Sequence, residues 1–237
     1  MRVLINHLTR MHGGHICVAG VDLDSRRHVR PVLQHDSVPA ELLSRYGGPF
    51  DMARIVELGN VRPTPNPPHV EDQVFVPSWA KVERTVSTHE FWNLLHETSR
   101  STLREIFGTG LRAIGGSRLG TDLGKGEASL GCLRLCRPAQ LYLRTRPNGA
   151  QQIRIKLDDG ELRADSGVTD LRLYGPDHAT PDAAIVRGVA KWIADSKGVI
   201  LGVGLTRKFR PSDDADYYHW LQVNNIHLQE DPVWQLA

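Results

Sequence analysis

The residues best suited to ligand chemistry gather in one C-terminal stretch, residues 199–228, which reads VILGVGLTRKFRPSDDADYYHWLQVNNIHL. An apolar strand pattern leads there into a basic corner, an acidic loop and a second strand with aromatic and amide side chains. Basic groups hold a phosphate backbone, aromatic rings stack on bases, and amides read base edges. The stretch therefore predicts a site for single-stranded nucleic acid, with the candidate residues Arg207, Lys208, Arg210, Tyr218, Trp220 and Asn224.

Trp220 has two interpretations. Side chains alternate between the faces of a strand, so Trp220 is expected to share a face with Asn224, while Asn225 points to the opposite face. On the ligand face the indole ring stacks on a base, whereas on the other face it belongs to the core. The sequence leaves both open.

The N-terminus repeats the first part of this pattern. Residues 3–11 read VLINHLTRM and residues 200–209 read ILGVGLTRKF, so an apolar strand runs into Leu-Thr-Arg twice. A polar-edged strand follows in both places, RHVRPVL at 27–33 and YHWLQVNNIHL at 218–228. We therefore expect two related β-rich halves, and we add Arg10 and Arg30 to the predicted nucleic-acid site.

The net charge of +2 conceals a basic stretch. Between Arg112 and Lys156 nine Lys and Arg residues stand against two acidic ones, which suits a polyanion because each phosphate contact releases counterions. Arginine outnumbers lysine 23 to 6 along the chain, so base composition of the gene and ordinary solvated strand faces explain the same stretch equally well.

The sequence contains neither a recognisable catalytic motif nor a recognisable metal-binding motif. The glycine-rich residues 108–131 match neither a phosphate-binding loop nor a dinucleotide fingerprint, and no nucleophile elbow is found. Cys132 and Cys136 have no second cysteine pair, and the histidines lack zinc-protease spacing, so we expect no metal, no cofactor and no catalytic residue. The three cysteines, with Cys17, are expected to be free and buried. An enzyme would have to use the loop from Asp213 to His219.

The elements that must position these residues are mainly strands. Short alternating segments fill both halves, and two helices stand out, at 88–107 and at 181–197, the second with Thr180 as N-cap and Pro181 at its first position. We expect a first domain at 1–107, a glycine-rich connector at 108–130 and a second domain at 131–237. Apolar runs are shorter than the roughly 18 residues of a membrane span, and the N-terminus shows no signal-peptide core, which predicts a cytoplasmic protein.

Several phrases resemble a known family. LTRM, LGCLRLCRP, SGVTDLRLYG, VGLTRKF and HWLQVNNIHL are similar to the bacterial dual OB-domain proteins found in prokaryotic conflict and defence systems. The resemblance implies two OB-fold-like β-barrels and nucleic-acid binding with no assigned catalytic residue. Together with the elements above, we expect a mainly β (α+β) fold of two such barrels with two interspersed helices. We expect a non-catalytic module that binds or senses single-stranded DNA or RNA within a larger assembly, with protein partners and no membrane. An enzyme of nucleotides or nucleic acid and a protein-binding adaptor are the alternatives.

Overall fold

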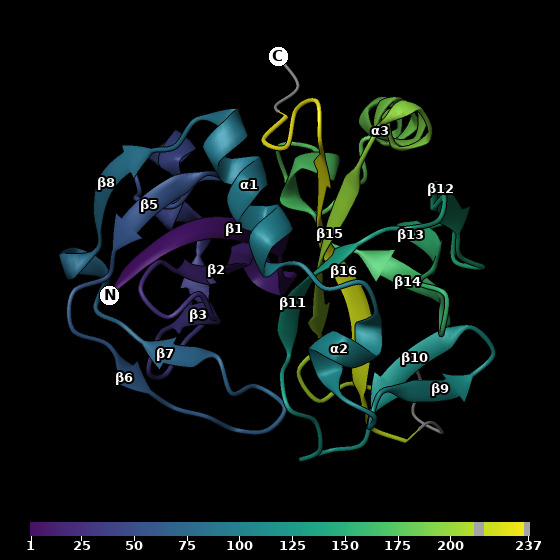
Figure 1. The fold of residues 1–237 in the computed structure, drawn as a ribbon, viewed down its shortest axis with the longest axis horizontal. Helices are drawn as coiled ribbons and strands as arrows, with labels where there is room; N and C mark the ends of the chain where they lie inside the picture. The colour runs from purple at the N-terminus through teal and green to yellow at the C-terminus, as the bar shows by residue number, and fades with distance from the viewer. Residues whose placement is uncertain (211–215, 235–237) are drawn as a thin grey trace.

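The protein is mainly β and consists of two curled sheets, with α1 (Thr88–Thr98) packed on the first and α2 (Leu103–Phe107) and α3 (Ala183–Asp195) on the second, as expected for two OB-like barrels (Figure 1). The structure, a computed structural model, describes residues 1–210 and 216–234. The two sheets meet in the middle of the molecule, where β1 of the first half lies against β16 of the second (Figure 1). Among the described residues, each helix is too short or too polar to cross a membrane.

The first sheet has the strand order β6-β7-β3-β2-β1-β5-β8, with β4 paired to β2. Its strands are β1 (Arg2–Arg10), β2 (His15–Asp22), β3 (His28–Val32), β4 (Val38–Pro39), β5 (Arg54–Glu57), β6 (Arg62–Pro63), β7 (Asp72–Val74) and β8 (Lys81–Thr85). β1 and β2 form an antiparallel hairpin, so the strand that pairs with β1 after Arg10 is β2 and not residues 27–33.

The second sheet has the order β11-β15-β16-β14-β13-β12, and the β9-β10 hairpin pairs with β16. Its strands are β9 (Arg112–Gly115), β10 (Arg118–Thr121), β11 (Leu130–Arg134), β12 (Gln140–Thr145), β13 (Gln151–Asp158), β14 (Arg163–Val168), β15 (Val199–Leu205) and β16 (His219–Leu228). β15 and β16 form the antiparallel hairpin that residues 199–228 predict.

The helices differ from expectation at their ends. Residues 88–107 form two helices, α1 (Thr88–Thr98) and α2 (Leu103–Phe107), because Thr102 and Glu105 make a complete capping box that begins a new helix. α3 is Ala183–Asp195, and its N-cap is Asp182, whose carboxylate accepts from two backbone N–H groups, so the expected start at Thr180 and Pro181 is wrong. Short 3-10 helices complete the described elements: His12–Gly14, Ala40–Leu42, Ser44–Tyr46, Pro77–Trp79 and Leu171–Leu173.

The glycine-rich residues 108–130 are more than a connector. They contain the β9-β10 hairpin, whose turn uses Gly116 with a φ of 57°. At Gly120 an added Cβ would lie 2.9 Å from the carbonyl oxygen of His219, so the missing side chain lets β10 approach β16. Of the glycines that suggested a loop here, Gly120 serves close strand packing.

Two hydrophobic cores lie on the two sides of the central strands. α1 packs on the first core through Phe91, Leu94 and Leu95. α2 and α3 pack on the second core, which contains Leu103, Phe107, Val186, Val189 and Ile193. β11 and β15 supply both cores, since Cys132 and Ile200 belong to the first, and their neighbours Leu133 and Leu201 to the second. Alternating side chains of these two strands thus fasten the halves together.

A β-bulge in β16 changes which side chains face the first half. Gly202 is opposite Asn225 while Val203 is opposite Val223, so Asn224 is an extra residue. Inward positions are Leu221 and Val223 before the bulge and Ile226 and Leu228 after it. Asn224 and Asn225 therefore both turn toward β1, where Asn224 contacts His7 and Asn225 binds the Leu8 backbone. The expectation that they face opposite sides is wrong.

Candidate nucleic-acid interface

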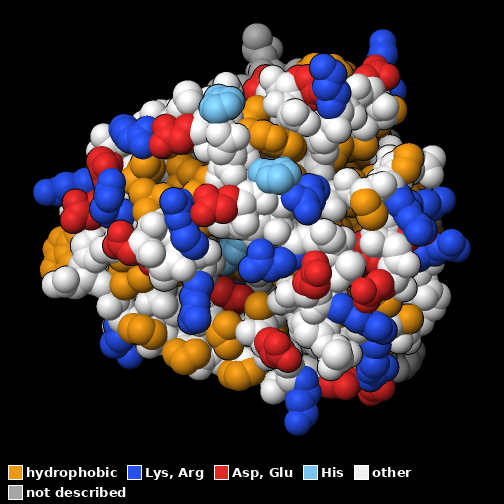
Figure 2. Space-filling model, viewed as in Figure 1, with side chains coloured by type: hydrophobic (Ala, Val, Ile, Leu, Met, Phe, Trp, Pro, Cys, Tyr) orange, Lys and Arg blue, Asp and Glu red, His pale blue; other side chains and the backbone are white. Residues whose placement is uncertain are grey.

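Aromatic and basic side chains gather around the first residues of β16. We call this set the aromatic–basic surface; its members are Arg112, Arg118, Lys208, Phe209, Arg210, Tyr217, Tyr218 and Trp220. Figure 2 shows Lys and Arg side chains over the region of β9 and β10, with acidic side chains beside them. Arg112 of β9 donates to the carboxylate of Asp122 at 2.7 Å.

Strand pairing brings these residues together from distant parts of the chain. β10 pairs with β16 so that Gly120 lies opposite Trp220, and the β9-β10 hairpin carries Arg112 and Arg118 to the same place. On the other side, Phe209 and Tyr218 exchange two backbone hydrogen bonds of 3.1 Å. The surface is thus held by backbone pairing, although its side chains come from the β9-β10 hairpin, a loop and the start of β16.

Cations lie over the rings at this surface. The Arg118 guanidinium lies 5.1 Å from the ring centre of Trp220, and Tyr218 meets Trp220 edge to face at 5.4 Å. Arg112 lies 5.9 Å from the ring centre of Tyr218, and Lys208 lies 4.4 Å from that of Tyr217. Such pairs offer planar faces to bases and positive charge to phosphates within one area.

Trp220 lies partly exposed at this surface. Its indole N–H donates to the carbonyl oxygen of Phe209 at 2.9 Å, which fixes the ring orientation. Its backbone N–H donates to the Thr206 hydroxyl, and its carbonyl accepts from the Thr206 N–H. The Leu-Thr-Arg corner therefore fixes the start of β16, and the ring lies outside the two hydrophobic cores.

Arg207 and Arg30 share one partner, Asp72 at the start of β7. The Arg30 Nε donates to Oδ1 of Asp72 at 2.6 Å, and Arg207 donates to Oδ2 at 2.6 Å. Arg30 is 5 % exposed and also donates to the Ser129 hydroxyl, so it lies in the interior between the halves. The Arg207 side chain remains half exposed at the edge of the aromatic–basic surface.

Two other predicted residues lie elsewhere. Arg10 donates to the carbonyl oxygen of His178 at 2.8 Å and lies over the ring of Tyr174. Asn224 is buried and contacts His7 and Gln222. Of the eight predicted residues, the structure brings Lys208, Arg210, Tyr218 and Trp220 into the aromatic–basic surface and Arg207 to its edge.

Sequence reasoning left Arg112 and Arg118 out of the site. Both lie in the basic stretch, but pairing of β10 with β16 is a long-range contact that no local pattern reveals. Their spacing from the aromatic residues exceeds 90 positions. The only signal was the charge of the stretch itself.

The loop proposed for an enzyme has its histidine in the interior. His219 is buried, its Nδ1 lies 2.9 Å from the Thr206 carbonyl oxygen, and its ring meets His69 at 5.0 Å. Burial and the charges of Arg30 and Arg207 lower the pKa of His69 to about 2. Asp216 is exposed, and Asp213 and Asp214 lie outside the described residues.

The cysteines are free, and only one is fully buried. Cys136 is exposed at the end of β11, so the expectation of three buried thiols is wrong. Burial raises the pKa of the Cys132 thiol to about 12, and Asn6 donates to its sulfur at 3.4 Å. One ligand atom each from Cys132, His7 and His28 lies within 4.8 Å of the others, which makes this cluster a candidate metal-binding set.

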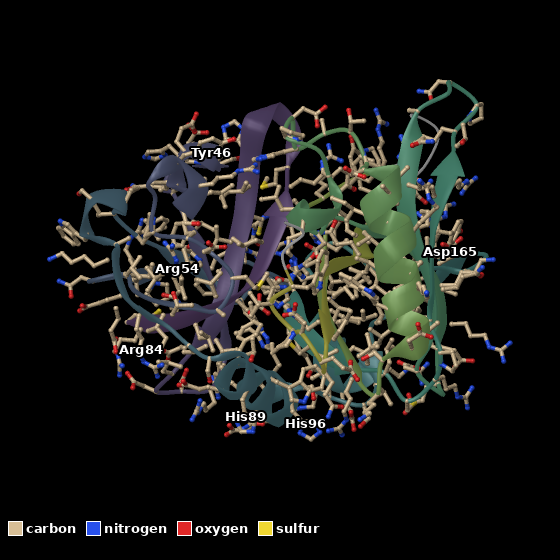
Figure 3. All side chains as sticks on the ribbon, turned by 90° about the horizontal axis from the view of Figure 1, so that it is seen from above. Tyr46, Arg54, Arg84, His89, His96 and Asp165 are labelled. Carbon is tan, nitrogen blue, oxygen red and sulfur yellow. The ribbon has the colours of Figure 1, made fainter. Side chains whose placement is uncertain are left out.

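A groove of about 430 Å³ runs beside α1, lined in part by Arg84, His89, Glu90 and Asn93. Figure 3 shows Arg84, His89 and His96 along one side of the molecule, away from Asp165 of the second sheet. Arg84 and Glu90 pair across this groove at 2.9 Å. Both arginines of the groove, Arg26 and Arg84, pair with acids that line it, whereas Arg118 and Lys208 of the aromatic–basic surface lie over aromatic rings. The groove therefore suits an anionic ligand less well than that surface does.

Comparison with known proteins agrees with this architecture. A search of the curated proteins finds no match. The family model described as the dual OB-containing domain matches residues 1–226, which cover both sheets and most of β16. The chain therefore belongs to the dual OB-containing domain family.

Proposed function

We propose that this protein binds single-stranded nucleic acid at the aromatic–basic surface. The observation that carries the proposal is the stack formed by Arg118, Trp220 and Tyr218 at the start of β16. Stacking tolerates any base because every base has a π-face, and neighbouring cations follow the backbone. Barrels of the OB type bind oligonucleotides across a strand face and its flanking loops.

The position of the stack also supports a ligand role. Aromatic side chains of the cores, such as Trp234 and Tyr174, are buried, whereas Phe209 is 54 % exposed and Tyr217 is 39 % exposed. A contiguous exposed patch of aromatic side chains rimmed by charged residues is typical of an interaction site. Arg207 extends the positive charge along the edge, with Asp72 holding it in place.

The decisive experiment is fluorescence anisotropy with labelled single-stranded DNA and RNA at low salt, comparing Trp220→Ala with Trp79→Ala. Trp79 is a matched control because it is half exposed but belongs to the first half. We expect Trp220→Ala to weaken binding by about 1–3 kcal/mol and Trp79→Ala to leave it unchanged.

Stability of each variant is measured by urea unfolding. We expect Trp220→Ala to remain folded, since its ring lies outside both cores. A loss of about 3 kcal/mol or more in the free energy of unfolding would assign the ring to the core instead. Failure of the unmodified protein to bind either nucleic acid would reject the proposal.

We propose further that the protein is a non-catalytic module of a prokaryotic defence assembly in the cytoplasm, with protein partners. The resemblance of its sequence phrases to dual OB-domain proteins of conflict and defence systems motivates this part. A nuclease or helicase encoded beside the gene would agree with it, and metabolic neighbours would contradict it.

We also propose that the two barrels divide at residues 99–102. α1 packs on the first core and α2 on the second, which supports a division before α2 and not after residue 107.

A further inference from the structure

Three metal-ligating side chains meet where the two sheets join. His7 comes from β1, His28 from β3 and Cys132 from β11, so the first half supplies two of them and the second half one. Their ligand atoms, nitrogen or sulfur in each case, lie within 4.8 Å of one another. This set shares no residue with the aromatic–basic surface.

The distances fit one small cation. The Cys132 Sγ lies 3.6 Å from the His28 Nε2. With a zinc–sulfur bond of about 2.3 Å and a zinc–nitrogen bond of about 2.0 Å, two ligands of a tetrahedral site lie about 3.5 Å apart. These two atoms therefore already have the spacing of zinc ligands, and His7 needs only a small side-chain adjustment to join them.

The cluster also contains polar atoms that the described residues leave without a partner. Among these residues, His7 Nε2 and Asn6 Oδ1 are buried and make no hydrogen bond, and both side chains are 0 % exposed. Each such atom costs about 1–3 kcal/mol when it is left unsatisfied. A bound cation could accept a lone pair from each of these two atoms.

Asn6 offers the fourth ligand. Its amide nitrogen lies 3.4 Å from the Cys132 sulfur, so the amide already reaches the cluster. The nitrogen and oxygen of an amide occupy nearly the same volume, and rotation of the amide presents Oδ1 to the same point. One thiolate and two imidazoles are ligands typical of Zn²⁺, and the amide oxygen would complete a tetrahedral set.

We propose that His7, His28, Cys132 and Asn6 bind one structural Zn²⁺ that fastens the two barrels together. The bulge of β1 between Ile5 and His7 turns Asn6 and His7 toward the second half, where β11 presents Cys132. His28 is half-buried and gives the ion a path from solvent. Asn224 lies on the other side of the His7 ring, with its amide Nδ2 3.3 Å from Nδ1.

Metal analysis of the purified full chain tests the proposal first. We expect about one zinc per chain, removed by a strong chelator with a fall in thermal midpoint, and restored by added Zn²⁺. Chelated protein loaded with Co²⁺ should show the near-ultraviolet charge-transfer absorption of a cobalt thiolate. Protein that neither retains zinc nor takes up either ion overturns the proposal.

Variants identify the ligands. Cys132→Ser should abolish the cobalt–thiolate absorption, while Cys17→Ser, a matched control on β2 outside the cluster, should keep it. Absorption that survives in Cys132→Ser contradicts the assignment. Because Cys132 is buried, His28→Ala at the half-buried rim provides a second test, with circular dichroism confirming the fold. We expect it to weaken zinc binding tenfold or more, and unchanged affinity counts against the site.

Discussion

The side-chain amide of Asn225 takes the place of a neighbouring strand for Leu8. Its Oδ1 accepts from the Leu8 N–H at 2.9 Å, and its Nδ2 donates to the Leu8 carbonyl oxygen at 3.2 Å. Asn225 is 0 % exposed and Leu8 is also buried, so water cannot replace these hydrogen bonds to the Leu8 backbone. One side chain thus joins β1 of the first barrel to β16 of the second.

We expect Asn225→Ala to lower the free energy of unfolding by about 3 kcal/mol. The substitution leaves a buried donor and a buried acceptor unsatisfied, each at a cost of about 1–3 kcal/mol. Urea unfolding followed by circular dichroism measures the loss. Asn60→Ala, at an exposed position, serves as control and should change stability by less than about 0.5 kcal/mol. A loss below about 1 kcal/mol for Asn225→Ala would mean that β1 and β16 are held by other contacts.

Asp72 should matter far more for stability than Arg207 does. Asp72→Ala leaves Arg30 charged, buried and without its carboxylate, for which we expect a loss of about 3–5 kcal/mol. Arg207→Ala removes a half-exposed partner while Asp72 keeps Arg30, so the expected loss is about 1 kcal/mol or less. Unfolding free energies of the two variants decide this, and equal losses would show that Arg207 is the main partner.

Local patterns in the sequence predicted a strand or helix well where residues within that element determine its conformation. The β15-β16 hairpin, its Leu-Thr-Arg corner and the mainly β architecture agree with the structure. The expected helix at 88–107 failed because Thr102 caps a second helix within it. The start of α3 failed because Asp182 caps better than Thr180, which instead hydrogen-bonds with Asp177.

The site could be predicted only in part because its geometry depends on long-range pairing. Alternation along β16 holds up to the bulge, and no local signal marks Asn224 as the extra residue. Arg30 resembled a surface cation in the sequence, yet its parallel partner strand places Asp72 beside it and draws it into the interior. His7, His28 and Cys132 have no motif spacing, so only the folded chain brings them together.

His69 should make the protein sensitive to acid. Its ring lies near Arg30, Arg207 and His219, and burial with these charges lowers its pKa from 6.5 to about 2. Below pH 6.5 the unfolded chain binds a proton at this residue that the folded chain does not. Stability is therefore complete above pH 6.5 and falls as the pH drops, by about 1.4 kcal/mol per pH unit from this group.

Urea unfolding at pH 7 and pH 5 measures this effect. We expect His69→Asn to lose about 2 kcal/mol less than the unmodified protein between these two pH values. The same substitution at His89, on the outer side of α1 (Figure 3), should leave the difference between the two pH values unchanged. Equal acid sensitivity with and without His69 would show that other groups cause it.

The salt dependence of binding should report how many phosphates the arginines of the β9-β10 hairpin meet. For single strands, log affinity falls with log salt by about 0.7 per phosphate contact. Arg118→Ala should lower that slope by about 0.7 and weaken binding at low salt, because Arg118 supplies both charge and a plane over Trp220. Arg187→Ala on the exposed side of α3 is the matched control and should leave the slope unchanged. Anisotropy titrations at a series of sodium chloride concentrations measure both slopes. If the two variants share the slope of the unmodified protein, the phosphates lie elsewhere on the molecule.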